Sequence, residues 1–133
     1  MLELALHTLL AAHAPLVQLV GTRIALAELP EGSAYPALVY QVVSQTPSVR
    51  LCKQANSKLN RVQLNAIATD AVVMESVEKA ALAALVSDTS RQPVANGLHV
   101  RSVRAVGWGP WSRDGTAGVW TRACDLFVFT QEP

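Results

Sequence analysis

The residue types that could do chemistry are few in this chain of 133 residues, and they lie far apart. The three histidines, His7, His13 and His99, fall on separate predicted elements, and the sequence contains no HExxH or Cys/His spacing. A zinc site needs three or four His, Cys or acidic ligands brought together. The sequence therefore predicts no metal, and we expect His99, on a strand, to be a partly exposed surface residue.

Neither cysteine is placed as a nucleophile, because a nucleophilic thiol needs a positioned base and no histidine lies beside either one. Cys124 alternates with Leu126 and Val128 toward the predicted core, where a thiol is small and inert. Cys52 lies next to Lys53, and a nearby cation lowers a thiol pKa, so a reactive role for Cys52 stays open as the lesser alternative. Two cysteines are too few for a disulfide scaffold.

Asp125 is the carboxylate that most needs an explanation, because it lies in the middle of a predicted strand. A carboxylate there must be solvated, paired or placed in an interface. Arg122, Arg101 and Arg104 are the candidates to pair with it. A structural ion pair is favoured over a catalytic role.

Two further motifs are interpreted as structural. Glu75 and Glu78 are three residues apart on a predicted helix, but Lys79 follows Glu75 at i+4 and makes an ordinary surface pair. The stretch "GWGPW" contains GxG without a third glycine, and a proline follows where a phosphate-binding helix would begin. The sequence thus predicts no catalytic residue and no cofactor.

Composition limits the class of function. Lys and Arg number 11 against 10 Asp and Glu, a net charge of +1, whereas a dedicated nucleic-acid binder usually shows a clear basic excess. Charged residues make up 16% of the chain, below the roughly 25% that is typical. This indicates either a surface covered by a partner or by further copies, or a compact apolar monomer. With no signal peptide and no apolar stretch of membrane length, we expect a soluble protein made in a cytosol, without a membrane partner.

Three helices must position these residues. Four leucines at helical spacing predict an N-terminal helix: Leu2, Leu6, Leu9 and Leu10. Pro15 and Gly21 suit the first turn and the end of a short second helix. Thr69 or Asp70 is predicted to cap a helix that continues to about Val86. Its predicted inner face consists of Val73, Val77, Ala80, Ala81 and Ala84.

The remaining apolar segments are predicted strands, at 22–29, 35–44, 58–69, 98–106 and 119–130. In the third of them Val62 and Leu64 face one way, while Arg61 and Gln63 face a wetter side. The order of the elements predicts one α+β domain over residues 1–133. It is an antiparallel sheet of about four to five strands, with an N-terminal helix and one long helix packed on one face.

Two loops carry residues that this architecture does not use, one at 44–58 and one between the last two strands. Exposed Trp and Arg are common interface residues, although each Trp could instead fold back on its own sheet end and the basic loop could be a merely solvated arm. The predicted assembly interface consists of Arg50, Lys53, Lys58, Arg61, Trp108, Trp111 and Arg113.

Four segments, in order, resemble a known family: "GTRI", "LPEGSAYPALVYQVVS", "RVQLNAIATDAVVMESVEKAALAAL" and "VWTRACDLFVF". Together they are similar to the tail-completion, or tail-terminator, proteins of long-tailed bacteriophages and prophages. The resemblance covers essentially the whole chain. It is carried by a pattern of elements, and it supplies no catalytic residues.

The resemblance implies a structural virion protein that is not an enzyme. Such a protein forms a ring, typically a hexamer, at the head-proximal end of the tail tube, stops tube polymerisation and docks to the neck. The implied partners are other copies of the chain, the major tail tube protein and a neck or head-completion protein. DNA would pass through the lumen without sequence-specific binding, and assembly would take place in the host bacterial cytoplasm.

Two alternatives stay open. The first is a head-closure or neck protein, or another minor tail component, with a related protomer. The second is a small-ligand-binding or enzymatic α+β domain, which needs a pocket with convergent polar groups. Its first candidate residues are Asp125, Arg101, Arg104 and His99.

Overall fold

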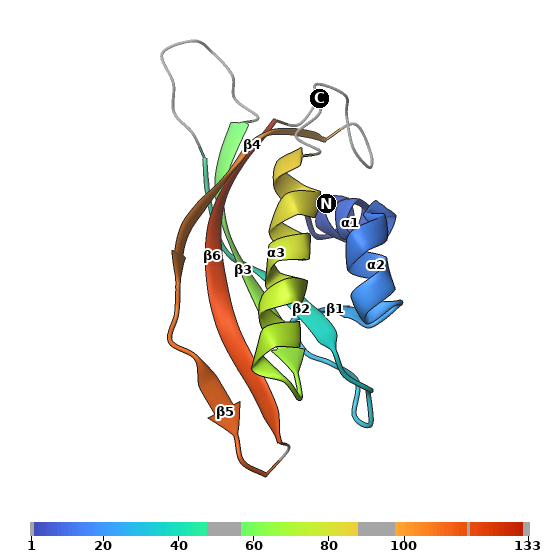
Figure 1. Ribbon diagram of the computed structural model, residues 1–133. Helices are drawn as coiled ribbons and strands as arrows, with labels where there is room; N and C mark the ends of the chain where they lie inside the picture. Colours follow the sequence, from blue (N-terminus) through green and yellow to red (C-terminus); the bar gives the residue numbers. More distant parts are fainter. Residues whose placement is uncertain (1, 48–56, 88–97, 117, 132–133) are drawn as a thin grey trace.

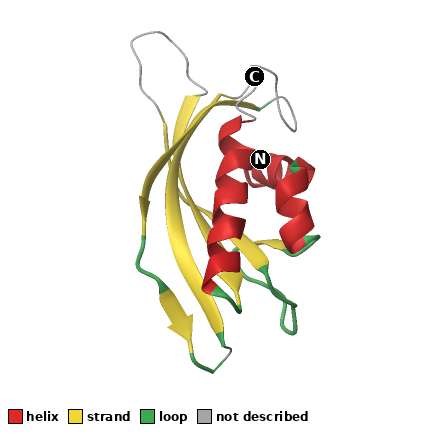
Figure 2. Ribbon diagram, in the orientation of Figure 1, coloured by secondary structure: helices red, strands yellow, loops and turns green. Residues whose placement is uncertain are grey.

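A layer of helices covers one face of a curved sheet in the computed structural model, which describes residues 2–47, 57–87, 98–116 and 118–131 (Figures 1 and 2). The helices are α1 (Leu2–Ala12), α2 (Ala14–Val20) and α3 (Ala71–Ser87). The strands are β1 (Ile24–Leu26), β2 (Ala37–Pro47), β3 (Ser57–Ala68), β4 (His99–Trp108), β5 (Ser112–Asp114) and β6 (Val119–Gln131). The predicted α+β class, with helices on one face of the sheet, is confirmed.

The sheet has the order β1–β2–β3–β6–β4, and β5 pairs with β6 beyond the end of β4. The neighbours from β2 to β4 are antiparallel, as predicted, but β1 runs parallel to β2. The predicted strand at 22–29 is also shorter than expected. It ends at Leu26 because the next residue, Ala27, takes a left-handed φ of 67°, which a strand cannot continue.

The core lies between the sheet and the helices. The alternation predicted for β3 is confirmed, since Val62 and Leu64 are at most 1% exposed while Arg61 is exposed. On the neighbouring strand β6, Cys124 and Leu126 are fully buried on the same face. A single face of each strand thus supplies the sheet's side of the core.

Helix α3 lies along this face, close to it because its inner surface is rich in alanine. The predicted cap is confirmed, because the Oδ1 atom of Asp70 accepts a hydrogen bond of 2.8 Å from the backbone N–H of Val72. The fully buried side chains are Met74, Val77, Ala81, Ala84 and Leu85, whereas the predicted Val73 and Ala80 are partly buried against the core. One acidic residue, Glu78, shares the buried face.

Helices α1 and α2 complete the layer. The predicted apolar stripe of α1 is buried, and Gly21, with a φ of 59°, ends α2 as expected. Among the described residues, no single helix combines the length and apolar character needed to cross a membrane. Helices α1 and α2 reach that length and apolar character only as a pair, and their axes are bent by 87° where they join. Leu6, Leu10 and Leu16 of this pair are fully buried in the core.

Two leucines of α1 provide a matched test of this packing. Leu6→Ala removes a fully buried side chain and should lower the free energy of unfolding by about 2–5 kcal/mol. Leu4→Ala removes a side chain that is 48% exposed and should change it by less than about 0.5 kcal/mol. Urea denaturation followed by circular dichroism measures both, and equal losses would contradict the position of α1.

Candidate functional site

The structure places the residues of the predicted assembly interface on more than one surface. Lys58 and Arg61 both lie on β3, in the middle of the sheet, but they are three residues apart, so their side chains point to opposite faces. Trp108 ends β4, Trp111 lies between β4 and β5, and Arg113 is in β5, at the edge of the sheet. Arg50 and Lys53, and the reactive alternative Cys52, lie outside the described residues.

The second predicted loop is in fact an interrupted edge strand. The backbone N–H of Gly109 still donates to the carbonyl oxygen of Ala123 at 2.8 Å, but Pro110 has no N–H to continue the ladder. Pairing resumes when β5 lies antiparallel to residues 119–121 of β6. The sequence did not predict β5, because a three-residue strand beside Gly, Pro and Trp has no apolar alternation.

This end of the sheet carries aromatic and cationic side chains, which we call the aromatic edge: Trp108, Trp111, Arg113, Trp120 and Arg122. The last four of these form a stack. The rings of Trp111 and Trp120 meet edge to face, with centroids 6.3 Å apart and planes at 76°. The guanidinium carbon of Arg122 lies 5.2 Å from the Trp111 ring, and that of Arg113 lies 5.9 Å from the Trp120 ring. Both distances are within the range of cation–π attraction.

The structure bears on one of the two sequence interpretations of the tryptophans, the one in which each Trp folds back on its own sheet end. Trp111 folds back on its own sheet end, and yet it stays 45% exposed, while Trp108 is 52% exposed. The stack holds the side chain of Trp111 in place without covering it. An exposed aromatic side chain in a fixed position loses little conformational entropy when a partner binds it.

A buried ion pair anchors the stack to the helix layer. Both carboxylate oxygens of Glu78 accept hydrogen bonds from Arg122, one from Nε at 3.1 Å and one from Nη2. The two side chains are only 3% and 16% exposed. The hydrogen bonds to Glu78 raise the pKa of Arg122 further, so the guanidinium is fixed as a cation.

Sequence reasoning missed the role of Glu78, although a signal was present. Glu78 follows Met74 at i+4 and precedes Ala81 and Leu85 on the same apolar stripe, so its carboxylate had to point toward the core. The prediction for its neighbour is confirmed, because Glu75 and Lys79 form an exposed pair at 3.6 Å.

Cys124 is fully buried, as predicted. Burial, followed by the charges of Glu78 and Asp125, raises the pKa of its thiol to about 11, so it stays protonated at neutral pH.

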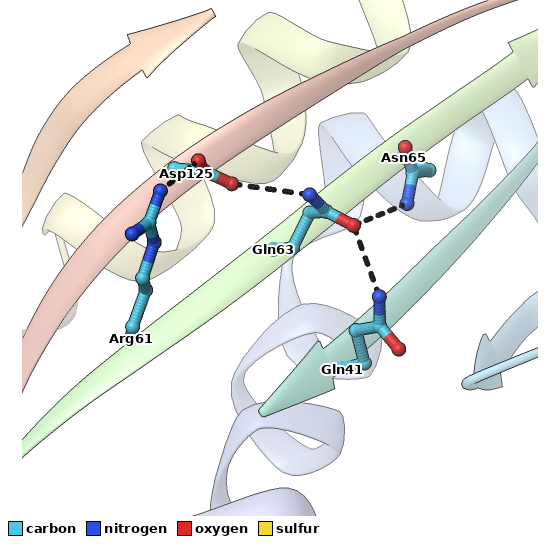
Figure 3. Close-up of polar contacts among 5 residues, drawn as sticks. All are labelled: Gln41, Arg61, Gln63, Asn65 and Asp125. Carbon is cyan, nitrogen blue, oxygen red and sulfur yellow. Dashed lines mark hydrogen bonds and ion pairs between the residues drawn. The ribbon is translucent and has the colours of Figure 1, made fainter. Parts of the chain in front are cut away.

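The second surface is a polar ladder on the face that the helices leave uncovered: Gln41, Arg61, Gln63, Asn65 and Asp125 (Figure 3). The carboxylate of Asp125 accepts from Arg61 Nη2 at 2.7 Å and from Gln63 Nε2 at 3.2 Å. The Oε1 atom of Gln63 in turn accepts from Gln41 Nε2 at 2.9 Å and from Asn65 Nδ2 at 3.4 Å. The ladder therefore joins β2, β3 and β6.

The partner predicted for Asp125 is wrong, although the ion pair itself is present. Arg61 takes the place of Arg122, Arg101 and Arg104. Arg122 is three residues from Asp125 on β6, and successive side chains of a strand point to opposite faces, so it lies on the helix side. Arg61 pairs with Phe127, the second residue after Asp125 on β6, which makes it a diagonal neighbour. Because of this register, the hydrogen bond from Arg61 holds the pKa of Asp125 below its ordinary value.

Of the four residues proposed for a small-molecule pocket, the structure describes the side chains of Asp125 and Arg104. Asp125 is occupied by Arg61 and Gln63, while Arg104 is exposed opposite Phe127. The side chains of His99 and Arg101 lie outside what the structure describes. Within the described part of the chain, no three His, Cys, Asp or Glu side chains gather as a metal ion would require.

The anchoring role of Glu78 can be tested by substitution. Glu78→Gln leaves the guanidinium of Arg122 without its counter-charge, and loss of one partner of a buried pair should cost about 3 kcal/mol of stability. Glu75→Gln is the matched control on the same helix, where an exposed pair contributes less than about 1 kcal/mol. Urea denaturation at pH 7 measures both. Similar, small losses would mean that Arg122 is not held by Glu78.

The polar ladder should show itself in the pH dependence of stability. The pKa of Asp125 is lower in the folded protein than in the unfolded chain, where it is about 4. The ionised side chain therefore adds to the free energy of unfolding above that pH. This contribution is lost as the pH falls through the pKa of the folded protein. Asp125→Asn should therefore lower stability at pH 7, by about 1 kcal/mol or less for so exposed a pair. At about pH 2 the difference from wild type should shrink toward zero. A difference that does not vary with pH would rule out the ion pair with Arg61.

Comparisons with known proteins give a family from one search and a fold from another. The family model described as "Tail completion protein gp17" matches residues 4–124. Among solved structures, a chain from "Virion of native gene transfer agent (GTA) particle" is similar in fold, with a TM-score of 0.70 and 17% sequence identity. The alignment covers 98% of this chain and 94% of that chain. No curated protein matches. Since the family match extends over most of its length, this chain belongs to the tail completion protein gp17 family.

Proposed function

We propose that this protein is a structural virion component that forms a ring, typically of six copies, at the head-proximal end of a phage-like tail tube. There it ends tube polymerisation and joins the tail to the neck. The observation that carries this proposal is the family match over residues 4–124. The similarity of fold to a chain of a gene transfer agent virion supports it.

The chemistry of the described residues is in keeping with a structural role. The carboxylates that sequence analysis singled out for chemistry are occupied by partners within the chain, Glu78 by Arg122 and Asp125 by Arg61. Their pairing stabilises the protomer and occupies both carboxylates with hydrogen bonds from within the chain. In this proposal the protein is not an enzyme, and residues 1–133 are one domain.

The proposed partners are other copies of the chain, the tail tube protein and a neck or head-completion protein. In a cyclic ring each subunit presents two different surfaces to its two neighbours. The exposed Trp108 and Trp111, with Arg113, suit one such surface, since Trp and Arg are common in interface hot spots. Lys58, Arg61, Arg50 and Lys53 are proposed for contacts with the tube or a neighbouring copy.

The proposed location is the tail of a virion assembled in the host bacterial cytoplasm. The lumen of the ring would then surround DNA as it passes. A net charge of +1 is in keeping with weak contact to phosphates and no sequence-specific binding, because strong binding depends on many Lys and Arg contacts to the phosphates.

The mass of the purified protein, alone and mixed with tail tubes, is the direct test. Multi-angle light scattering should give the mass of six copies of the 14.2 kDa chain, in solution or after addition of tubes. Electron microscopy should show the protein at one end of each tube, and added tube protein should no longer extend that end. A protein that stays monomeric and ignores tubes would refute the proposal, and one that binds isolated necks alone would favour the head-closure alternative.

A further inference from the structure

We propose that the ring contact joins the aromatic edge of one copy to the acidic loop between β1 and β2 of the next copy. This acidic loop comprises residues 27–36. The inference rests on the proposed function, because it names the two surfaces that meet when the ring forms. The occupant of the aromatic edge is in this proposal a second copy of the same chain.

The acidic loop carries negative charge and apolar surface in a fixed shape. Glu28 and Glu31 are exposed, and residues 27–36 include no Lys or Arg. Leu26 and Tyr35, at either end of the loop, are 49% and 39% exposed. Such a combination of exposed apolar side chains and like charges on a short surface loop suits a partner with aromatic and cationic side chains.

Hydrogen bonds hold the acidic loop in place. The backbone N–H and Oγ of Ser33 both donate to the carbonyl oxygen of Pro30, at 3.2 and 2.6 Å. The N–H of Ala27 donates to the carbonyl oxygen of Tyr40 at 2.9 Å, and Arg23 Nε donates to the carbonyl oxygen of Pro36 at 2.8 Å. A loop that is already ordered loses less conformational entropy on binding.

The aromatic edge offers the complementary chemistry. Arg113 is exposed and lies over the ring of Trp120, while Trp108 and Trp111 are exposed as well. An Arg guanidinium binds a Glu carboxylate through two parallel hydrogen bonds, and Trp faces pack well against proline and tyrosine rings. Asp114 follows Arg113 on β5, so the two side chains point to different faces of the sheet. Arg113 is paired with Trp120 and Asp114 with Val119. The carboxylate of Asp114 therefore does not cancel the charge of Arg113 on the face of the aromatic edge.

The two surfaces lie at the same level of the sheet, at its opposite edges (Figure 1). A single row of paired residues crosses from one to the other: Ser112 of β5, Thr121 of β6, Ile67 of β3 and Ala37 of β2. Ala37 directly follows the acidic loop, and Ser112 directly follows Trp111.

This alignment is what a closed ring requires. When one surface binds a different surface on the next copy, an offset along the axis builds a helical filament, and a contact without offset can close. With both surfaces on one row of the sheet, copies arranged around an axis parallel to the strands meet without such an offset. The fold thus matches the aromatic edge to the acidic loop in height as well as in chemistry.

Charge reversal on each side tests the contact. The first variant is Arg113→Glu, and the second combines Glu28→Lys with Glu31→Lys. Each alone places like charges opposite each other, so self-association should weaken by about tenfold or more. An equimolar mixture should restore it. In a ring of alternating variants the reversed edge of one meets the reversed loop of the other, and the two normal surfaces meet each other, so opposite charges face at every contact. Arg104→Glu, a reversal on the exposed opposite face of β4, is the matched control and should assemble like wild type.

Light scattering of the full-length proteins, alone and on tail tubes, gives the result, and circular dichroism verifies that each variant is folded. Restored assembly in the mixture alone would support the proposal. Variants that assemble like wild type would overturn it and leave the ring itself intact. Variants that still form rings but no longer bind tubes would overturn it too, since the surfaces would then face the tube protein. A wild-type protein that neither forms rings nor binds tubes would instead refute the proposed function.

Discussion

The difference in length between β6 and α3 is the constraint on which much of this structure depends. Thirteen residues of strand extend over about 43 Å at about 3.3 Å per residue, whereas seventeen residues of helix reach only about 26 Å. The helix cannot cover the whole inner face of the strand. Where β6 begins, below the lower end of α3 in Figure 1, the stack of Trp111 and Trp120 with two arginines provides the cover. Arg122, bound to Glu78, joins this cover to the helix layer, so one buried ion pair connects the core to the exposed edge.

Polar side chains fix how the strands align on both faces of the sheet. On the uncovered face the ladder from Gln41 to Asp125 crosses three strands. On the helix side, fully buried Asn60 donates through Nδ2 to the carbonyl oxygen of Val128 and to Oγ1 of Thr130, both at 2.9 Å. Its Oδ1 accepts from Gln45 Nε2 at 3.0 Å. A shift of one residue between β3 and its neighbours would reverse the faces of these groups and leave buried donors unpaired. The sheet is therefore held in register by specific contacts as well as by apolar burial.

Much of the fold could be predicted from the sequence, because local periodicity carries it. The leucine stripe of α1, the cap at Asp70 and the alternation of β3 each follow from residue type and spacing. The contacts at the site could not, because they depend on pairing between distant strands. The register of β3 against β6 brings Arg61 within reach of Asp125, and the anchoring of Arg122 depends on which side of α3 meets the sheet. β5 escaped prediction because backbone pairing with β6 holds it, and no apolar pattern marks it. The assembly interface is a proposal, because the sequence of one chain does not identify the surface that binds the next copy.

The concentration of the three tryptophans has a practical consequence. The chain contains Trp at 108, 111 and 120 only, and all three belong to the aromatic edge. Indole emission responds to the polarity around the ring and to nearby charges, and here the guanidinium groups of Arg113 and Arg122 lie over two of the rings. The intrinsic fluorescence of the unmodified protein therefore reports on this edge and on little else. Binding at the edge would change the emission spectrum in real time, without a label and without altering the protein.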